Sequence, residues 1–198
     1  MENKKSVELN ESSEKRRFFI ALLPPHEVQV AVNEAKAIMR DEYASKAAFR
    51  SPPHVTLHAP FEWPLAELDA LNEVLAQFAA VQEPVPMTLD GFNAFKPHVI
   101  YIDVVKREGL MALQPKLLDV VEQKLGVVSK SDRKRAFVPH MTVAFRDLKP
   151  AMFRKAWSVF QRREIHFDFM VYHLALLMHD GKLWQVKEKY AFKGVEAD

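Results

Sequence analysis

The sequence predicts an α+β fold with two similar lobes, each an antiparallel sheet backed by helices, around a central cleft. The chain has 198 residues, which is enough for one sizeable core or for two small lobes that share one. Short strand-like runs alternate with amphipathic helical patterns along almost its whole length. The order strand, helix, strand, helix, strand occurs twice, and this indicates a duplicated lobe.

The expected strands are short, apolar or alternating runs bounded by proline or glycine. The first five cover residues 18–23, 54–59, 85–89, 99–105 and 137–146. Two more, 165–178 and 183–192, are expected to close the fold as a hairpin around the turn at 179–182.

The expected helices carry apolar residues at the three- and four-residue spacing of an amphipathic helix. They cover residues 27–43, 65–81, 110–125 and 151–161. Gly126 is the expected stop of the third helix, because glycine favours the left-handed conformation found after many helix ends.

The domain organisation follows from composition. Residues 1–15 are polar, charged and aperiodic, and we interpret them as a flexible N-terminal arm. Residues 16–198 are predicted to form a single two-lobed domain, because no linker interrupts them. The pseudo-repeats span roughly 16–90 and 98–192, and we expect the lobes to share a continuous sheet system.

Composition excludes several kinds of site. The chain has no cysteine, which excludes disulfides, thiol catalysis and cysteine-ligated zinc. No segment approaches the ~20 apolar residues of a membrane span, and the early apolar run is too short for a signal peptide. We therefore expect a soluble, cytoplasmic monomer without membrane contact. The net charge of +2 is small, so attraction to phosphate would have to come from local clusters.

One short fragment occurs in both halves of the chain. Pro-His-Val-Thr-Leu at 53–57 returns as Pro-His-Met-Thr-Val at 139–143. The chain has only three threonines, and two of them stand two places after a histidine. A lone His-x-Thr would be a weak motif, but a matched pair is a specific signal.

Each fragment displays a histidine and a threonine on one side of a strand. Alternate side chains of a strand point the same way, so His54 and Thr56 share a face. His140 and Thr142 share a face in the second copy for the same reason. One imidazole can accept a proton while its twin donates one, and threonine hydroxyls can bind phosphate oxygens. Two such faces across a cleft would support acid–base chemistry at a phosphate.

These motifs, their order and their flanking segments resemble the two-histidine (2H) phosphoesterase superfamily. The branch most similar to this chain is that of the 2'-5' RNA ligase-like proteins, which act as RNA 2',3'-cyclic phosphodiesterases. The resemblance runs from about residue 16 to 192 and implies a LigT-like fold. It also implies that His54 and His140 are the catalytic pair, with Thr56 and Thr142 binding phosphate. By the same resemblance, His54 would be the acid and His140 the base.

The implied activity is metal-independent hydrolysis of 2',3'-cyclic phosphate ends of RNA, or the making and breaking of 2'-5' RNA linkages. The same chemistry on a small nucleotide, such as an ADP-ribose cyclic phosphate or a 2'-5' oligonucleotide, is an alternative. A non-catalytic RNA- or nucleotide-binding module is another. None of these activities is expected to need a cofactor. A zinc site at His54 and His58 is disfavoured, because Val55 replaces the glutamate of the helical zinc motif.

A basic run at 130–135 precedes the second motif strand. Such runs are commonly solvated loops. Because this run adjoins a predicted phosphate site, Arg133, Lys134 and Arg135 are also candidates for contact with an RNA backbone.

Other candidate contacts surround the motifs. His58 shares the expected strand face of His54 and is predicted at the rim of the site. Arg146 would lie about 20 Å from His140 if the strand continued at about 3.3 Å per residue, so contact with substrate is not expected. Three aromatic residues could stack on bases, although core packing is the favoured use. They are Phe92, Phe95 and Tyr101.

Overall fold

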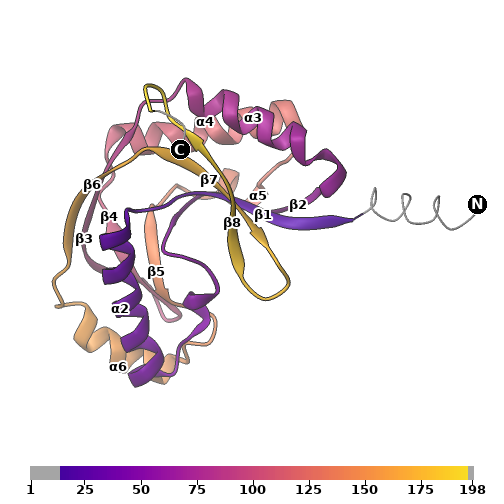
Figure 1. Ribbon diagram of the computed structural model, residues 1–198. Coiled ribbons are helices and arrows are strands. Elements are labelled where there is room, and N and C mark those ends of the chain that lie inside the picture. The colour runs from indigo at the N-terminus through magenta and orange to yellow at the C-terminus, as the bar shows by residue number, and fades with distance from the viewer. Residues whose placement is uncertain (1–13, 196–198) are drawn as a thin grey trace, which may run out of the picture.

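The computed structural model describes residues 14–195; the rest of the chain, and the side chains of Lys130 and Ser131, lie outside the description. Two four-stranded antiparallel sheets make up the fold, with strand orders β2-β1-β7-β8 and β5-β4-β3-β6 (Figure 1). The predicted α+β class is therefore confirmed. Two sheets replace the continuous sheet system that we expected.

The strands lie close to their predicted positions. They are β1 (Lys15–Leu22), β2 (Val55–Pro64), β3 (Val85–Phe95), β4 (Val99–Val104), β5 (His140–Ala144), β6 (His166–Val171), β7 (His173–His179) and β8 (Trp184–Ala191). Since β1 begins at Lys15, the last residue of the expected N-terminal arm belongs to a strand. The rest of that arm, residues 1–13, lies outside the described residues.

All four predicted helices are present. The helices are α2 (His26–Tyr43), α3 (Leu68–Ala80), α4 (Glu108–Leu125), α5 (Lys130–Lys134) and α6 (Pro150–Phe160), with short 3₁₀ turns η1 (Ala47–Arg50) and η2 (Leu65–Glu67). Gly126 ends α4 in the left-handed region at φ 67°, as predicted. The basic run forms the short helix α5 instead of a loop, and the Ser129 side chain caps it by accepting from the Asp132 N–H.

The closing hairpin is confirmed for β7 and β8, which pair from His173 opposite Ala191 to His179 opposite Trp184. The predicted strand at 165–178 is wrong, because the exposed Tyr172 divides it into β6 and β7. The two parts belong to different sheets: β6 pairs with β3, and β7 pairs with β1. Burial changes at the same point, from alternation in β6 to a continuous buried run in β7.

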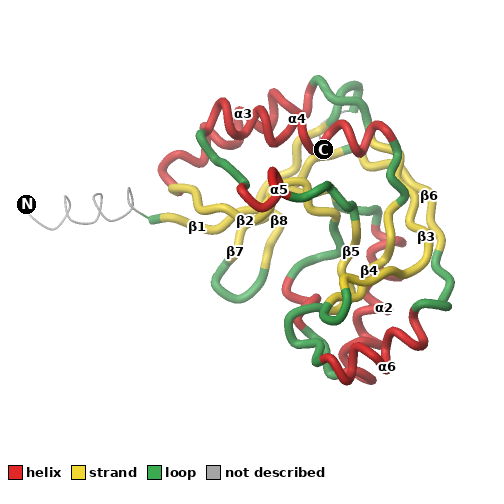
Figure 2. The backbone as a smooth tube through the Cα atoms, turned by 180° about the vertical axis from the view of Figure 1, so that it is seen from behind, coloured by secondary structure: helices red, strands yellow, loops and turns green. Residues whose placement is uncertain are grey.

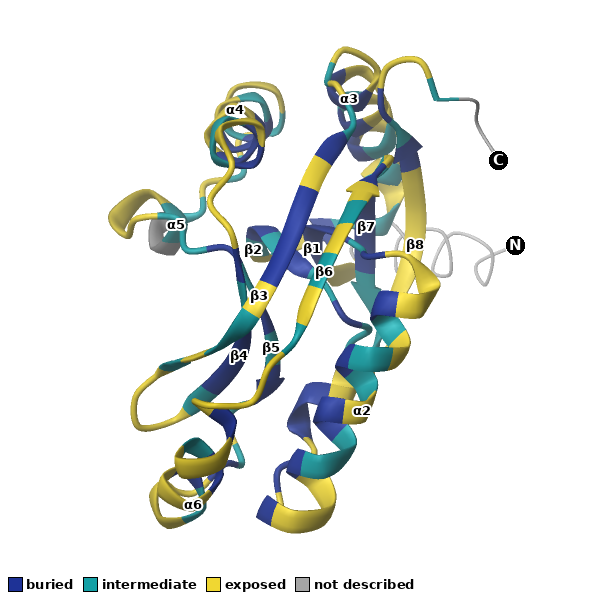
Figure 3. Ribbon diagram, turned by 90° about the vertical axis from the view of Figure 1, so that its left-hand side faces the viewer, coloured by how far each residue is buried: buried dark blue, intermediate teal, exposed yellow. Residues whose placement is uncertain are grey.

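Helices cover the two sheets from opposite ends of the molecule (Figure 3). Helix α3 packs against β7 and β8, α2 against β5, and α6 against β4. Helix α4 contacts both β2 and β3, so it joins the two sheets. One hydrophobic cluster contains buried side chains from both sheets, including Leu22, Leu57, Leu89 and Ile102. The lobes therefore share a core, and this fixes the position of β2 relative to β5.

Each sequence half contributes strands to both sheets. Strand β3 lies in the first pseudo-repeat but belongs to the second sheet, while β7 and β8 return from the second pseudo-repeat to the first sheet. The sheets and the repeats therefore do not coincide. No helix in the described part of the chain is long and apolar enough to span a bilayer.

Candidate active site

The two motif fragments meet at one pocket between the sheets. Strand β2 is an edge strand of the first sheet and β5 an edge strand of the second, and these two edges are in contact. His54, immediately before β2, and His140, at the start of β5, both line a cavity of about 310 Å³. Thr56 and Thr142 line the same cavity. The structure thus brings together the four side chains singled out by the repeated motif.

Both imidazoles are anchored in the same way. The Nδ1 atom of His54 lies 2.7 Å from the carbonyl oxygen of Pro52, and His140 Nδ1 lies 2.7 Å from that of Val138. A carbonyl oxygen only accepts hydrogen bonds, so each Nδ1 carries the proton and donates it. In the neutral ring, Nε2 is then the atom left to take up a proton. The second half of the chain repeats the tautomer of the first.

The electrostatic surroundings of the two rings differ. Burial lowers the pKa of His54 from 6.5 to about 4; the Pro52 carbonyl opposes this, and the positive charges of Lys36 and His140 add to it. Burial also lowers the pKa of His140, but the Val138 carbonyl and the Asp103 carboxylate both oppose that shift. Asp103 stands opposite His140 in the register of β4 and β5. The Lys36 ammonium therefore acts on the His54 ring, and the Asp103 carboxylate acts on the His140 ring.

Aromatic rings flank the His54 side of the pocket. The Phe19 ring centre lies 4.8 Å from that of His54, and Trp184 packs edge-on against Phe19 at 4.7 Å. Phe19 comes from β1 and Trp184 from the β7–β8 hairpin. These two side chains form a wall on which a base could stack.

The His140 side has a second aromatic group. Phe95 and Tyr101 lie 5.1 and 5.0 Å from the His140 ring. Phe95 is 41% exposed and lines the pocket, so the expectation of core packing is wrong for this residue. Tyr101 is buried, and Phe92 packs edge-on against the buried Phe160, so both follow the core expectation.

Two cations line the pocket, and among its described lining residues there is no aspartate or glutamate. One cation, Lys36 of α2, was not among the predicted site residues, because only the apolar residues of this helix were expected to face inward. Its side chain is buried, and Nζ donates to the Ser51 carbonyl at 3.0 Å. The available signal was its spacing, four residues after Val32 and three before Met39 on the buried stripe.

The other cation, Arg146, corrects an expectation. An extended strand would have carried it far from His140, but β5 ends at Ala144 and Arg146 adopts a left-handed φ of 58°. Its guanidinium lies over the Phe145 ring at 5.1 Å, and both residues line the pocket. The rise of about 3.3 Å per residue holds only within a strand. Because the chain turns after β5, Arg146 lies at the pocket instead of about 20 Å away from His140.

Asp147 holds this turn in place. Its carboxylate accepts from the Ser45 hydroxyl at 2.8 Å and from the backbone N–H groups of Lys46 and Ala47, each at 2.9 Å. These bonds connect the residue after Arg146 to the segment between α2 and η1. The Arg146 side of the pocket is thereby tied to the Lys36 side.

His58 does not share the face of Thr56. One residue of β1 spans two of β2 here, because Ile20 pairs with His58 whereas Ala21 pairs with Thr56. Such a bulge breaks the alternation, so His58 is 1% exposed instead of standing at a rim. Its ring packs edge-on against Phe61 at 5.0 Å, with Nδ1 2.7 Å from the Ala59 carbonyl oxygen. His58 is not among the pocket residues, and its predicted substrate contact finds no support here.

Residues 132–135, the part of the basic run whose side chains are described, do not line the pocket. Helix α5 adjoins β2, and Asp132 fastens it there by accepting from the Ala59 N–H at 2.9 Å (Figure 2). Arg133 pairs with Asp119 at 2.8 Å and Glu122 at 2.6 Å, both on α4. Lys134 and Arg135 are exposed. Their contact with RNA stays a prediction, while Arg133 is engaged by two carboxylates.

The sequence comparisons agree on one family. The model of the 2'-5' RNA ligase superfamily matches residues 24–183. A Geobacillus kaustophilus protein named "Putative phosphoesterase" is 29% identical over 184 residues, covering 91% of this chain and 98% of that protein. A protein of the same name from Geobacillus sp. (strain WCH70) is 30% identical over 186 residues, covering 92% and 99%.

Solved structures share the fold. TT0787 of Thermus thermophilus superposes with a TM-score of 0.67 at 24% identity, covering 91% of this chain and 100% of the other. Escherichia coli LigT complexed with 3'-AMP gives a TM-score of 0.67 at 20% identity, covering 90% and 99%. The predicted LigT-like fold is therefore confirmed.

Proposed function

Because this chain belongs to the 2'-5' RNA ligase superfamily of 2H phosphoesterases, we propose that its pocket hydrolyses 2',3'-cyclic phosphate ends of RNA or breaks 2'-5' RNA linkages, without a metal. One observation carries the proposal: two identically anchored histidines and two threonines line a cavity that holds cations and, among its described lining, no carboxylate. Such a cavity attracts an anion and presents acid–base groups to it.

The chemistry follows from the atoms that face the cavity. One neutral imidazole takes a proton from water through Nε2, and the water oxygen attacks phosphorus. The other ring, protonated, gives its Nε2 proton to the leaving ribose oxygen. Each proton transfer is typically worth ~10²–10⁴ in rate. The hydroxyls of Thr56 and Thr142 can hold the non-bridging oxygens while the charge rearranges. If a 5'-hydroxyl attacks the cyclic phosphate in place of water, the same two proton transfers make a 2'-5' linkage as the 3' oxygen leaves. The reverse of that step breaks the linkage, with the roles of the two rings exchanged.

The relatives support a phosphoester substrate with a nucleoside. Two relatives carry the name "Putative phosphoesterase", and LigT was crystallised with 3'-AMP, whose phosphate is attached to ribose. In this chain Phe95 and Trp184 stand on different sides of the pocket, so a nucleoside on either side of the phosphorus would meet an aromatic ring.

Turnover of the four nucleoside 2',3'-cyclic phosphates by purified protein in EDTA tests the proposal directly. We expect a nucleoside monophosphate as product in wild type, and its formation should be ~10²–10⁴ slower in His140→Ala. Activity that disappears with EDTA would contradict the metal-independent mechanism. Binding of nucleotide without turnover of cyclic phosphates or 2'-5' dinucleotides would favour the non-catalytic binding module.

A small nucleotide is the second candidate substrate, and the position of the basic run favours it. The pocket measures about 310 Å³, and residues 132–135, the part of the run whose side chains are described, are not among those that line it. Comparing kcat/KM for a mononucleoside cyclic phosphate with that for an oligonucleotide ending in the same group separates the two. A much higher value for the oligonucleotide supports RNA, whereas equal values support the small nucleotide.

A further inference from the structure

Lys36 is a buried cation in the wall of the pocket. Its side chain is 1% exposed, and its Nζ lies 5.9 Å from the centre of the Phe49 ring. An ammonium group has three N–H donors, and the hydrogen bond to the Ser51 carbonyl uses one of them. Among the described residues no carboxylate forms an ion pair with it. A buried charge in this condition is unfavourable unless an anion neutralises it.

The pocket offers one place for such an anion. Lys36 lines the same cavity as His54 and Thr56, and its charge acts on the His54 ring. Burial lowers the pKa of Lys36 to about 8, so the ammonium form still predominates at neutral pH. No acidic side chain among the described pocket residues competes for this charge. An anion bound beside His54 would therefore meet a cation with N–H donors to spare.

We propose that Lys36 binds a non-bridging oxygen of the substrate phosphate beside His54. This inference rests on the proposed function of the same pocket. The contact would neutralise the buried ammonium and use an N–H donor that the Ser51 carbonyl leaves free.

Binding of inorganic phosphate at neutral pH, measured by isothermal titration calorimetry, tests the contact. Replacing Lys36 with methionine removes the charge at similar length, and we expect phosphate to bind about 10- to 100-fold more weakly. Arg40→Met is the matched control: it removes a cation from the same helix that also lies over Phe49, at 5.4 Å, but does not line the pocket. Equal affinities in wild type and Lys36→Met would overturn the proposal.

A second measurement uses the wild-type protein, in case Lys36→Met does not fold. The charge of sulfate is constant near neutral pH, so a change in sulfate affinity reports on the protein. Burial lowers the pKa values of His54 and His140 below 6.5, whereas the pKa of Lys36 is about 8, so above 6.5 it is the Lys36 charge that changes. We expect affinity to fall as the pH rises above about 8. Constant affinity through that range would contradict the contact.

The position of the Lys36 charge beside His54 has its own readout. In an NMR titration of the histidine ring protons, Lys36→Met should raise the pKa of His54, because it removes a neighbouring positive charge, while Arg40→Met should leave it unchanged. A merely structural role for Lys36, through the Ser51 carbonyl, predicts no such shift. An unchanged His54 pKa would contradict a charged Lys36 beside the phosphate site.

The two proposals fail separately. If phosphate binding depends on Lys36 but no phosphodiester is turned over, the proposed function is wrong and the Lys36 contact stands. If cyclic phosphates are turned over while Lys36→Met keeps the wild-type phosphate affinity and His54 pKa, the function stands and this inference is wrong.

Discussion

The catalytic roles proposed for His54 and His140 depend on one atom in each ring. Backbone carbonyls hold both Nδ1 atoms, so only the Nε2 atoms can exchange protons with a substrate. Replacing either histidine with alanine should reduce kcat by ~10²–10⁴, because one proton transfer is lost. The double variant should be much less than additive, since the rings act as a unit. Steady-state kinetics with a cyclic phosphate substrate measures this.

His98→Ala is the control for that experiment, because His98 is exposed and is not among the pocket residues. It should keep wild-type kinetics. Circular dichroism should show the wild-type fold in all the histidine variants, since both active-site histidines are only partly buried and line the pocket. An active His54→Ala or His140→Ala variant would remove that residue from the mechanism.

The lowered histidine pKa values predict an acidic optimum. The base must lose its proton and the acid must keep its own, so kcat/KM rises with pH through one pKa and falls through the other. These are about 4 for His54 and a value below 6.5 for His140. The profile measured at low substrate concentration should therefore be bell-shaped, with its maximum between about 4 and 6.5. A maximum above neutrality, or a flat profile, would contradict the environments described here.

Among individual site residues, the sequence predicts those in a repeated motif better than those that occur once. The four motif residues could be found because the same pattern occurs twice. Lys36 could not, because a lysine on a helix is ordinarily solvated, and only the packed helix shows its burial. Arg146 and His58 were misplaced for a related reason. A left-handed turn and a β-bulge interrupt the strand alternation from which both positions were inferred.

The basic run forms helix α5, which packs beside β2, and its contact with RNA can be tested. Replacing the exposed Lys134 and Arg135 together with glutamine should flatten the log-affinity versus log-salt slope for single-stranded RNA, by about 0.7 for each phosphate that is no longer neutralised. Arg133→Gln is the matched control, because Asp119 and Glu122 already engage that guanidinium. Filter binding at several salt concentrations measures the slope. If the double variant keeps the wild-type slope, these cations are simply solvated, and a small nucleotide becomes the preferred substrate.

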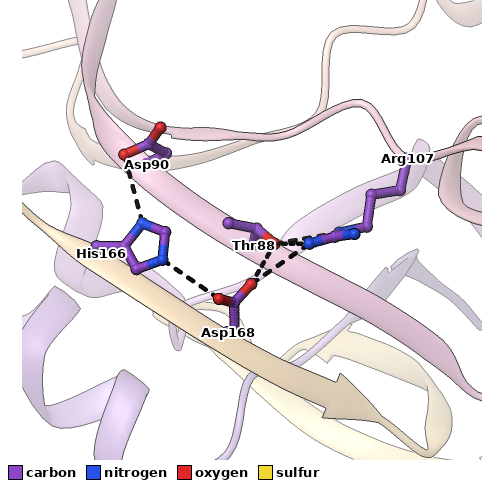
Figure 4. A network of polar contacts seen from close by, with 5 residues as sticks. All are labelled: Thr88, Asp90, Arg107, His166 and Asp168. Atoms are coloured by element: carbon purple, nitrogen blue, oxygen red, sulfur yellow. Dashed lines mark hydrogen bonds and ion pairs between the residues drawn. The ribbon is translucent and has the colours of Figure 1, made fainter.

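A polar network on β3 and β6 predicts how stability depends on pH. His166 of β6 lies between Asp90 and Asp168, and Thr88 donates to the carboxylate of Asp168, which Arg107 also contacts (Figure 4). Hydrogen bonds to Asp90 and Asp168 raise the pKa of His166 above 6.5. Its contribution to stability is therefore fully present below 6.5 and is lost as the pH rises through the raised pKa.

Urea unfolding of wild type and His166→Gln across this pH range tests that sign. We expect the variant to unfold at lower urea concentration on the acidic side of 6.5, and the two midpoints to converge as the pH rises. His26→Gln, on α2 and outside the network, is the control for loss of an imidazole. A constant difference between wild type and His166→Gln would show that protonation of His166 does not contribute.

The whole molecule shows what periodicity could and could not establish. The duplicated order of strands and helices was predictable, because each element has a local pattern. The exchange of strands between the sheets was not, because β3 pairs with β4 and β6, and β7 with β1, through pairings distant in sequence. This exchange places residues from both halves in one core and brings the edge strands β2 and β5 together at the pocket.

A shared core predicts that the two lobes unfold together. Phe160 of α6 is fully buried and packs against Tyr43 of α2 and Phe92 of β3, at 6.2 and 5.0 Å between ring centres. Phe160→Ala should lower the free energy of unfolding by about 3–5 kcal/mol, because it leaves a cavity in the core. Although the substituted side chain packs beside the second sheet, the first sheet should lose the same free energy of unfolding, because one hydrophobic cluster contains residues from both sheets.

Tryptophan fluorescence distinguishes cooperative unfolding of the two lobes from independent unfolding. Trp63 of β2 reports on the first sheet, and Trp157 of α6 packs beside the second. A third tryptophan, Trp184 of β8, is replaced in both reporter variants. In urea, the variant that keeps only Trp63 and the variant that keeps only Trp157 should unfold with the same midpoint, and Phe160→Ala should shift both midpoints equally. If the Trp157 signal shifts and the Trp63 signal does not, the sheets unfold separately. The pocket would then lie between two independent units, and its geometry could not be held by a common core.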